Sequence, residues 1–199
     1  MMQIAQYISS RMYVKKRRRS GLRRGFLTCI IGEIDKSRCV NYFSTVPKDE
    51  RTCKYMIREI TEHDFDQLMT LYMQLHDNPF PEKDEHVMEL WNCILADKNH
   101  HIIVAEEDGA IVSSCVCVII PNLTRGQRPY AFIENVITDE RYRKRGLATA
   151  CLHFAKEISK RENCYKMMLL TGSKQESTLK FYEQAGYNKK DKTAFIQWL

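Results

Sequence analysis

The hydrophobic and polar positions of residues 56–199 follow two different periods, which is typical of a chain that mixes strands with helices. Alternating or continuous apolar runs predict strands at Met56–Ile60, Ile102–Glu106, Ala110–Ile120, Tyr130–Thr138, Tyr165–Leu170 and Lys192–Trp198. Apolar positions at spacings of three and four predict helices after Thr61 and over Asp84–Leu95, Gly146–Arg161 and Ser177–Ala185. This order of elements predicts an α/β (α+β) fold.

Local signals mark where several of these elements start and stop. Thr61, followed by acidic residues, is typical of a helix N-terminus. Gly109 closes a predicted hairpin turn, and Gly186 ends the last predicted helix. One further strand near Tyr187 fits the pattern. We therefore expect a mixed central sheet of about six to seven strands flanked by about four helices.

Residues 1–55 lack this periodicity and carry most of the positive charge. They hold 13 Lys and Arg against 4 Asp and Glu, whereas residues 56–199 hold 18 against 21. Three interpretations stay open: a basic tail that contacts anions, an Arg-rich targeting peptide, or non-native sequence ahead of a true start at Met56. We favour the last, because the ordered pattern begins abruptly at Met56. We expect a basic, disordered or non-native extension over 1–55 and one domain over 56–199.

The composition, with 44% hydrophobic and 28% charged residues, lies in the range of soluble globular proteins. No apolar run approaches the roughly 18 residues of a membrane span. The eight cysteines include no C-x-x-C pair, and Cys93, Cys115, Cys117 and Cys151 lie within predicted helices and strands. We interpret them as reduced, buried thiols of a cytoplasmic protein and expect no membrane contact, no disulfide framework and no metal site.

The clearest chemical signal is the stretch Val136-Ile-Thr-Asp-Glu-Arg-Tyr-Arg-Lys-Arg-Gly-Leu-Ala148. A predicted strand ends, a basic turn follows, and Gly146 opens a predicted helix. The first N–H groups of a helix have no acceptor within the helix, and they bind phosphate with help from the helix dipole. Positive charge is added by Arg141, Arg143, Lys144 and Arg145. The spacing alone leaves open whether the turn binds a pyrophosphate or is a solvated basic helix start.

Two motifs resemble those of the GNAT acetyltransferase superfamily. Arg143-Lys-Arg-Gly-Leu-Ala148 is similar to its Q/R-x-x-G-x-G/A signature, and Phe181-Tyr-Glu-Gln-Ala-Gly-Tyr187 is similar to its F-Y-x-x-x-G-F/Y segment. The stretch around residues 121–130 resembles a bacterial subgroup, and Ile133-Glu-Asn-Val136 resembles glucosamine-phosphate N-acetyltransferases. The order of predicted elements is similar to the family fold over all of residues 56–199.

The resemblance implies that acetyl-CoA is the co-substrate and that particular backbone groups bind it. Its pantetheine arm would pair with the backbone of Val136, Ile137 and Thr138. Its pyrophosphate would lie on the backbone amides of Arg143, Lys144, Arg145, Gly146, Leu147 and Ala148. Many family members also carry an Asn early in the last helix, and Gln175-Glu-Ser-Thr178 stands there in this chain. Ser173, Ser177 or Thr178 would have to make that contact.

The resemblance also implies that Tyr182 lies near the sulfur of CoA and protonates the departing thiolate. A neutral phenol suits that task, because it donates a hydrogen bond where negative charge develops. The alternative is that Tyr182 is only a core aromatic on a short helix.

A general base is also needed, because an ammonium group must lose a proton before its nitrogen can attack a thioester. Glu134 stands two residues before Val136, and strand alternation predicts that both lie on the same face. Its carboxylate either takes this proton, or only binds the amine, or pairs with Arg128. Weaker candidates are His76, His100 and His101, the last two expected in a turn.

These features predict an N-acetyltransferase that moves the acetyl group of acetyl-CoA to a primary amine of a small molecule by direct attack in a ternary complex. The resemblance implies direct attack without a covalent enzyme intermediate, and Cys151, which has no His partner in the sequence, is a poor nucleophile candidate. The alternative is a non-catalytic acyl-CoA-binding or sensing module on the same fold. Nucleic acid would bind only through the basic tail, and family analogy predicts a homodimer.

The resemblance implies that the acceptor pocket is built by the first two helices and the loops around the central strands. Those loops are His76–Lys83 and Asn122–Tyr130, and they contain acids, arginines and aromatic residues. The sequence does not decide between an amino sugar, an amino acid, a polyamine, an antibiotic or a protein amine as the acceptor.

Overall fold

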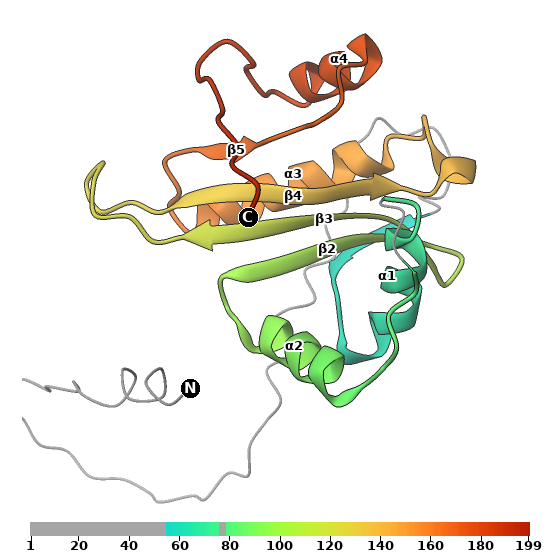
Figure 1. The fold of residues 1–199 in the computed structure, drawn as a ribbon. Coiled ribbons are helices and arrows are strands. Elements are labelled where there is room, and N and C mark those ends of the chain that lie inside the picture. Colours follow the sequence, from blue (N-terminus) through green and yellow to red (C-terminus); the bar gives the residue numbers. More distant parts are fainter. Residues whose placement is uncertain (1–54, 76–78) are drawn as a thin grey trace, which may run out of the picture. The chain divides into compact units, whose positions relative to one another are not determined.

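The computed structural model describes residues 55–75 and 79–199, and these form a five-stranded sheet with helices on both faces (Figure 1). The strands are β1 (Tyr55–Glu59), β2 (His100–Glu107), β3 (Ala110–Ile120), β4 (Tyr130–Thr138) and β5 (Met167–Leu169). They lie in the order β1-β2-β3-β4-β5. Neighbours are antiparallel except β4 and β5, which are parallel and are therefore joined by a helical crossover.

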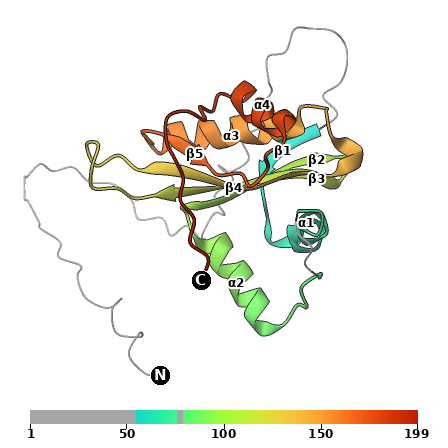
Figure 2. The same cartoon turned by 45° about the horizontal axis from the view of Figure 1, so that its top comes forward.

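The helices are α1 (Phe65–Tyr72), α2 (Glu85–Ala96), α3 (Leu147–Arg161) and α4 (Glu176–Gln184), with short 3₁₀ turns η2 (Glu62–Asp64) and η3 (Glu140–Tyr142). Figure 2 shows α1 and α2 on one face of the sheet and α3 and α4 on the other. The crossover between β4 and β5 is α3. The predicted α/β class and the four helices are confirmed.

Each face of the sheet has its own apolar core. On the α3 face, Cys115, Cys117 and Ile119 of β3 pack with Leu147 and other α3 residues. On the opposite face, Val116 of β3 packs with residues of α1 and α2. Because both faces of β3 are covered, its sequence is a nearly continuous apolar run, as expected for a central strand.

The prediction of six to seven strands is wrong for the described part of the chain, where the sheet has five. Residues 192–198, the predicted last strand, form no strand, and Phe195 and Trp198 are 93% and 88% exposed. No strand forms near Tyr187 either. A local sequence pattern can favour an extended backbone, but a strand forms only where a neighbouring backbone is present to bond with it.

Three other predicted elements differ in their bounds or kind. The helix after Thr61 begins with the η2 turn, because the Asp64 carboxylate accepts a hydrogen bond from the Thr61 N–H at 2.6 Å and closes a capping box. Strand β5 has only three residues, fewer than the predicted Tyr165–Leu170. His100 and His101 begin β2 and do not form a turn.

The cysteine prediction is correct for most of the thiols in the described part. Cys115, Cys117 and Cys151 are buried and free, and Cys164 is free and half-buried. Cys93 is free but exposed, because it lies on the outward face of α2. The remaining three cysteines lie outside the described residues.

The described region begins with β1 at Tyr55, one residue before the predicted domain start. The three interpretations of the N-terminal segment concern residues that lie outside the described part of the chain. Among the helices that the structure describes, none combines the length and the apolar character needed to cross a membrane.

Candidate active site

Strand β4 loses its partner on one side midway along its length. Its ladder with β5 pairs Ala131 with Met167, Phe132 with Met168 and Ile133 with Leu169. Beyond Ile133, residues 134–138 have no β5 partner in the described part of the chain. Apart from the Thr138 carbonyl, which accepts a hydrogen bond from Arg143, backbone groups on that side have no strand partner and can bond an extended ligand. Val136, Ile137 and Thr138, the predicted pantetheine contacts, lie in this segment.

A β-bulge interrupts β4 at the same place. Val116 of β3 pairs with Glu134, but Ser114 pairs with Ile137, so β4 has one extra residue there. Asn135 lies in this bulge with a left-handed φ of 49°. As a result, Val136 packs on the α3 face and Ile137 on the α1 face.

The bulge overturns the expectation that Glu134 and Val136 share a face. Glu134 lies opposite Val116, which belongs to the α1 face, and opposite residues of a ladder point to the same side. Val136 points to the α3 face. A strict period of two, which underlay the prediction, does not hold across an inserted residue.

The basic turn after β4 has the geometry of an anion site. Lys144 and Gly146 have left-handed φ values of 62° and 80°, and α3 starts at Leu147. The first helical hydrogen bond runs from the Ala150 N–H to the Gly146 carbonyl at 2.9 Å. The N–H groups of residues 146–149 precede it and therefore have no acceptor within the helix. Gly146, Leu147 and Ala148, predicted as pyrophosphate contacts, are among these residues, and their binding of pyrophosphate stays a prediction.

Three arginines near this turn are engaged with the protein itself. Arg145 Nη1 lies 3.3 Å from Glu107 Oε1, and its guanidinium stacks on the Tyr142 ring at 4.8 Å. Arg141 Nη2 binds Asp139 Oδ2 at 2.9 Å, and this hydrogen bond holds the pKa of Asp139 well below its usual range. Arg143 Nε donates to the Thr138 carbonyl at 3.3 Å.

Lys144 differs from these arginines. Its side chain is exposed and has no polar partner among the described residues. The arginines therefore stabilise the turn, which leaves the backbone amides and Lys144 as the groups available to an anion.

Tyr182 lies on α4, packed between two aromatic neighbours. Its ring centroid is 4.9 Å from that of Phe181 and 6.2 Å from that of Tyr187. Burial raises the pKa of Tyr182, with smaller contributions from the nearby Cys115 and Glu134. The phenol is therefore neutral at physiological pH and able to donate a hydrogen bond.

Other residues at the start of α4 were expected to contact the cofactor. Ser177 lies in the first turn of α4 and is exposed. The Ser173 hydroxyl accepts a hydrogen bond from the Gln175 N–H at 3.3 Å, and the Thr178 N–H donates to the Gln175 carbonyl at 3.0 Å. The Ser177 and Thr178 hydroxyls make no hydrogen bond within the described part of the chain, and of these two residues Ser177 is the more exposed.

Glu134 stands at the point where β4 leaves β5. Partial desolvation raises the pKa of its carboxyl group. The predicted alternative of a pair with Arg128 is wrong, because Arg128 donates to the carbonyls of Asn163 and Cys164 at 3.0 and 2.9 Å. The carboxylate therefore stays available to a ligand.

The histidine candidates lie elsewhere or outside the described residues. His101 Nδ1 lies 2.9 Å from a Glu59 carboxylate oxygen, on the β1 side of the sheet. His100 begins β2, and its pKa is lowered by burial. His76 lies outside the described part. No cluster of three or more His, Cys, Asp or Glu side chains within that part could hold a metal ion.

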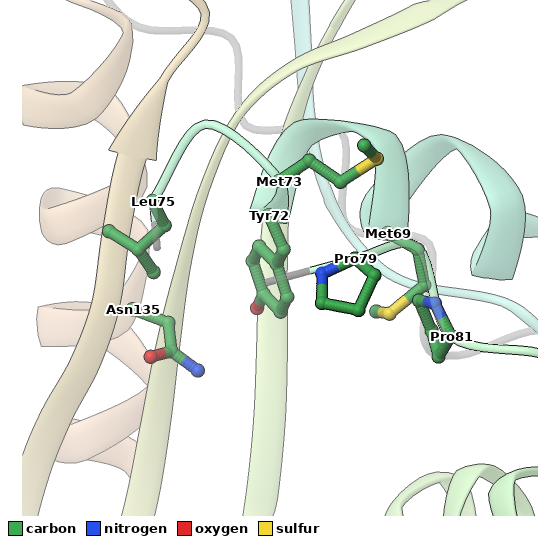
Figure 3. A pocket seen from close by; sticks show the side chains of 7 residues that line it. All are labelled: Met69, Tyr72, Met73, Leu75, Pro79, Pro81 and Asn135. Atoms are coloured by element: carbon green, nitrogen blue, oxygen red, sulfur yellow. The ribbon is translucent and has the colours of Figure 1, made fainter. Parts of the chain in front are cut away.

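A cavity of about 260 Å³ lies between α1, the segment around Pro79 and the β4 bulge (Figure 3). It is lined by Met69, Tyr72, Met73, Leu75, Pro79, Pro81 and Asn135. The predicted acceptor segment His76–Lys83 contributes two prolines, and Asn122–Tyr130 contributes none of these residues. Sequence reasoning assigned Tyr72 only to the helix core and missed Asn135. An Asn in mid-strand, a residue enriched at left-handed φ, is the signal that could have found the bulge.

The comparisons with known proteins agree with this geometry. Residues 65–187 match the model of the acetyltransferase (GNAT) family. A glucosamine 6-phosphate N-acetyltransferase from Trypanosoma brucei brucei is 40% identical over 79 residues, which are 40% of this chain and 52% of that protein. The chain thus matches only about half the length of this curated relative.

Solved structures show the same fold. A structure from Agrobacterium tumefaciens that carries the name acetyltransferase aligns with a TM-score of 0.67 and 36% identity, over 71% of this chain and 99% of that one. Glucosamine-6-phosphate N-acetyltransferase from Arabidopsis thaliana aligns with a TM-score of 0.64 and 24% identity, over 73% of this chain and 97% of that one. With the family match extending from α1 past α4, the chain belongs to the GNAT acetyltransferase family.

Proposed function

We propose that this protein is an acetyl-CoA-dependent N-acetyltransferase that acetylates a primary amine in a ternary complex. The observation that carries the proposal is the continuity of one candidate binding path. The unpaired edge of β4 ends in the turn that opens α3, and the exposed amides of that turn suit a pyrophosphate. Tyr182 on α4 and Glu134 on β4 lie close enough to influence each other electrostatically.

Acetyl-CoA supplies the thioester, and this chain's residues orient it. The backbone of Val136, Ile137 and Thr138 pairs with the amides of the pantetheine arm. The amides of residues 143–148 and the Lys144 side chain hold the pyrophosphate. Ser177, at the exposed start of α4, is the proposed additional contact with the cofactor.

The amine enters on the α1 face of β4, where Glu134 lies. Glu134 takes a proton from the ammonium group, directly or through a water, and the free nitrogen attacks the thioester carbonyl carbon. The C–N bond forms and the C–S bond breaks. Tyr182, on the opposite face, gives its proton to the leaving sulfur. The raised pKa of each group suits its role, because a stronger base accepts the proton and a neutral phenol donates one.

The test compares the full chain with its Tyr182→Phe variant, with thiol release from acetyl-CoA measured across a panel of primary amines. We expect kcat to fall about 100-fold or more in the variant while the Kd for acetyl-CoA stays within about twofold. The matched control is Tyr165→Phe, since Tyr165 packs on Tyr130 next to β5 and away from the unpaired β4 edge. Binding of acetyl-CoA without turnover of any amine would contradict the proposal and support a sensing module.

A further inference from the structure

We infer that Gln74 is a positioning residue that couples cofactor binding to the placement of α1. CoA bound at the turn after β4 holds the end of α1 in place through the Gln74 side chain, and α1 forms part of the wall of the neighbouring cavity. This inference rests on the proposed N-acetyltransferase function, which takes that turn as the pyrophosphate site.

The Gln74 side chain joins α1 to the β4–α3 turn, a name used here for residues 139–146. Gln74 follows α1 by two residues, and its N–H donates to the Leu71 carbonyl at 3.1 Å. Its Nε2 donates to Asp139 Oδ2 at 3.1 Å, and its Oε1 accepts a hydrogen bond from the Glu140 N–H at 3.2 Å. Because both ends of one amide bind successive residues of the turn, they fix its distance and its orientation relative to α1.

Asp139 makes this contact a strong one. Asp139 is only 6% exposed, and its carboxylate accepts three hydrogen bonds from Arg141, at 2.9, 3.0 and 2.9 Å, besides the one from Gln74. The hydrogen bonds from Arg141 hold the pKa of Asp139 well below its usual range, so the carboxylate is ionised. A hydrogen bond to an ionised acceptor is roughly twice as strong as one between neutral groups. The bond from Gln74 belongs to this stronger class.

The β4–α3 turn itself is mostly exposed. Segments with little buried surface open more easily than the core, so the polar contacts of the turn determine how firmly it is held. In the described part of the chain these include Gln74 at its start and Glu107, which contacts Arg145 at 3.3 Å. An anion on the amides of residues 146–149 would hold the turn more firmly. Opening of α1 that breaks the Gln74 contact should then be less frequent.

Another glutamine anchors α1 at a different place. The Gln67 Oε1 atom accepts a hydrogen bond from the Ile111 N–H at 2.9 Å, so it joins α1 to the start of β3. Gln67 and Gln74 are both exposed. Of the two, Gln74 is the one that contacts the β4–α3 turn, which makes Gln67 a matched control for any effect on α1 alone.

The test measures hydrogen exchange of the Met73, Gln74 and Leu75 amides by NMR in the full chain, with and without saturating CoA. These N–H groups donate hydrogen bonds at the end of α1 and exchange when it opens. We expect CoA to slow their exchange about tenfold in the wild type. Gln74→Met keeps the length of the side chain and removes both of its hydrogen bonds. In this variant CoA should slow the exchange by less than about twofold.

Coupling between two sites is reciprocal, so the same factor must appear in the affinity for CoA. The CoA Kd, measured by calorimetry, should therefore rise about tenfold in Gln74→Met. A residue that only stabilised α1 would not change this Kd. An unchanged Kd in a variant with an unaltered near-ultraviolet circular dichroism spectrum would therefore overturn the inference.

Gln67→Met should speed the exchange of α1 amides, because it also removes a hydrogen bond that anchors the helix. It should keep the slowing by CoA and leave the CoA Kd within about twofold of the wild type. Loss of the CoA effect in Gln67→Met as well as in Gln74→Met would show that any weakening of α1 suffices, and would overturn the specific role of Gln74.

Neither readout requires turnover, which keeps the two proposals apart. If CoA slows the exchange as expected but the protein acetylates no amine of the panel, the proposed reaction is overturned and the role of Gln74 stands. If the wild type acetylates an amine but CoA affects α1 equally in the wild type and in Gln74→Met, the role of Gln74 is overturned and the proposed reaction stands. Undetectable CoA binding would overturn both.

Discussion

Glu134 and Tyr182 are the proposed base and acid, and Glu134 is exposed whereas Tyr182 is half-buried. Desolvation raises the pKa of both groups. For the carboxylate this increases basicity, and for the phenol it preserves the proton that a leaving thiolate needs. The same physical effect therefore suits a base on one face of β4 and an acid on the other.

Glu134→Gln should lower kcat about 100-fold at neutral pH, because the amide cannot accept the proton. In the wild type the rate should rise with pH through the Glu134 pKa, which lies above that of an ordinary glutamate. This acidic limb should vanish in the variant. The measurement is kcat/KM against pH.

Stability provides the control for this variant. When a carboxyl group has a raised pKa in the folded state, its contribution to the stability of the fold is lost as pH rises through that pKa. Gln at position 134 should therefore not lower the unfolding free energy at neutral pH. The matched variant Glu89→Gln, at an exposed position on α2, should leave both rate and stability unchanged. Equal rates for Glu134→Gln and the wild type would eliminate Glu134 as the base.

At the scale of elements, the ion pair between Arg58 and Asp64 stabilises the connection from β1 to α1. Arg58 binds Asp64 through two hydrogen bonds, and the side chain of Asp64 is only 6% exposed. Burial raises the pKa of Asp64, but its hydrogen bonds to Arg58 and Thr61 outweigh this and bring the pKa below its ordinary value. The pair thus joins β1 to the first turn before α1.

Asp64→Asn should destabilise the fold by about 3 kcal/mol, because it leaves the partly buried Arg58 without its main partner. Since the folded pKa of Asp64 is lowered, its contribution is present above the ordinary aspartate pKa and is lost as pH falls through the folded value. Urea unfolding at several pH values measures this. Asp66→Asn should lower the unfolding free energy by less than about 1 kcal/mol, because the Asp66 side chain is 62% exposed and water screens its pair with Lys83.

The turn that opens α3 is the second element-scale prediction. Gly146 has a φ of 80°, where a residue with a Cβ is strained. Gly146→Ala should cost about 1–2 kcal/mol of stability and weaken acetyl-CoA binding by at least about tenfold, as the amides of the turn move. Gly172→Ala, at a glycine without a left-handed φ and with open space around it, should change neither value. Unaltered acetyl-CoA affinity in Gly146→Ala would argue against the pyrophosphate site.

At the scale of the whole molecule, the C-terminal segment exposes four large apolar side chains: Phe195, Ile196, Trp198 and Leu199. Apolar groups gathered on a surface mark contact sites. We expect a homodimer that this segment stabilises.

The double variant Phe195→Ser/Trp198→Ser should shift the chain toward monomer in light scattering after size exclusion. Leu123→Ser removes one side chain that is 88% exposed on the β3–β4 loop and should leave the dimer unchanged. A wild-type chain that is monomeric at all micromolar concentrations would contradict this prediction.

The accuracy of the sequence predictions depended on how local the responsible interactions are. The bounds of β3 and β4 were predicted correctly, because both are long apolar runs closed by polar turns. The end of α3 at Arg161 was also predicted correctly. The sixth strand and the shared face of Glu134 and Val136 were wrong, because both depend on a neighbouring backbone far away in the sequence.

By itself the sequence determined the α/β class, the main helices and central strands, and the basic glycine turn between β4 and α3. These follow from side-chain periodicity and backbone preferences that act over a few residues. The tertiary structure alone decided the bulge at Asn135, the unpaired edge of β4, the ion pairs that engage the arginines of the turn, and the apolar cavity around Tyr72. Each of these depends on which distant residues come into contact, because register, pairing and enclosure exist only once the chain has folded.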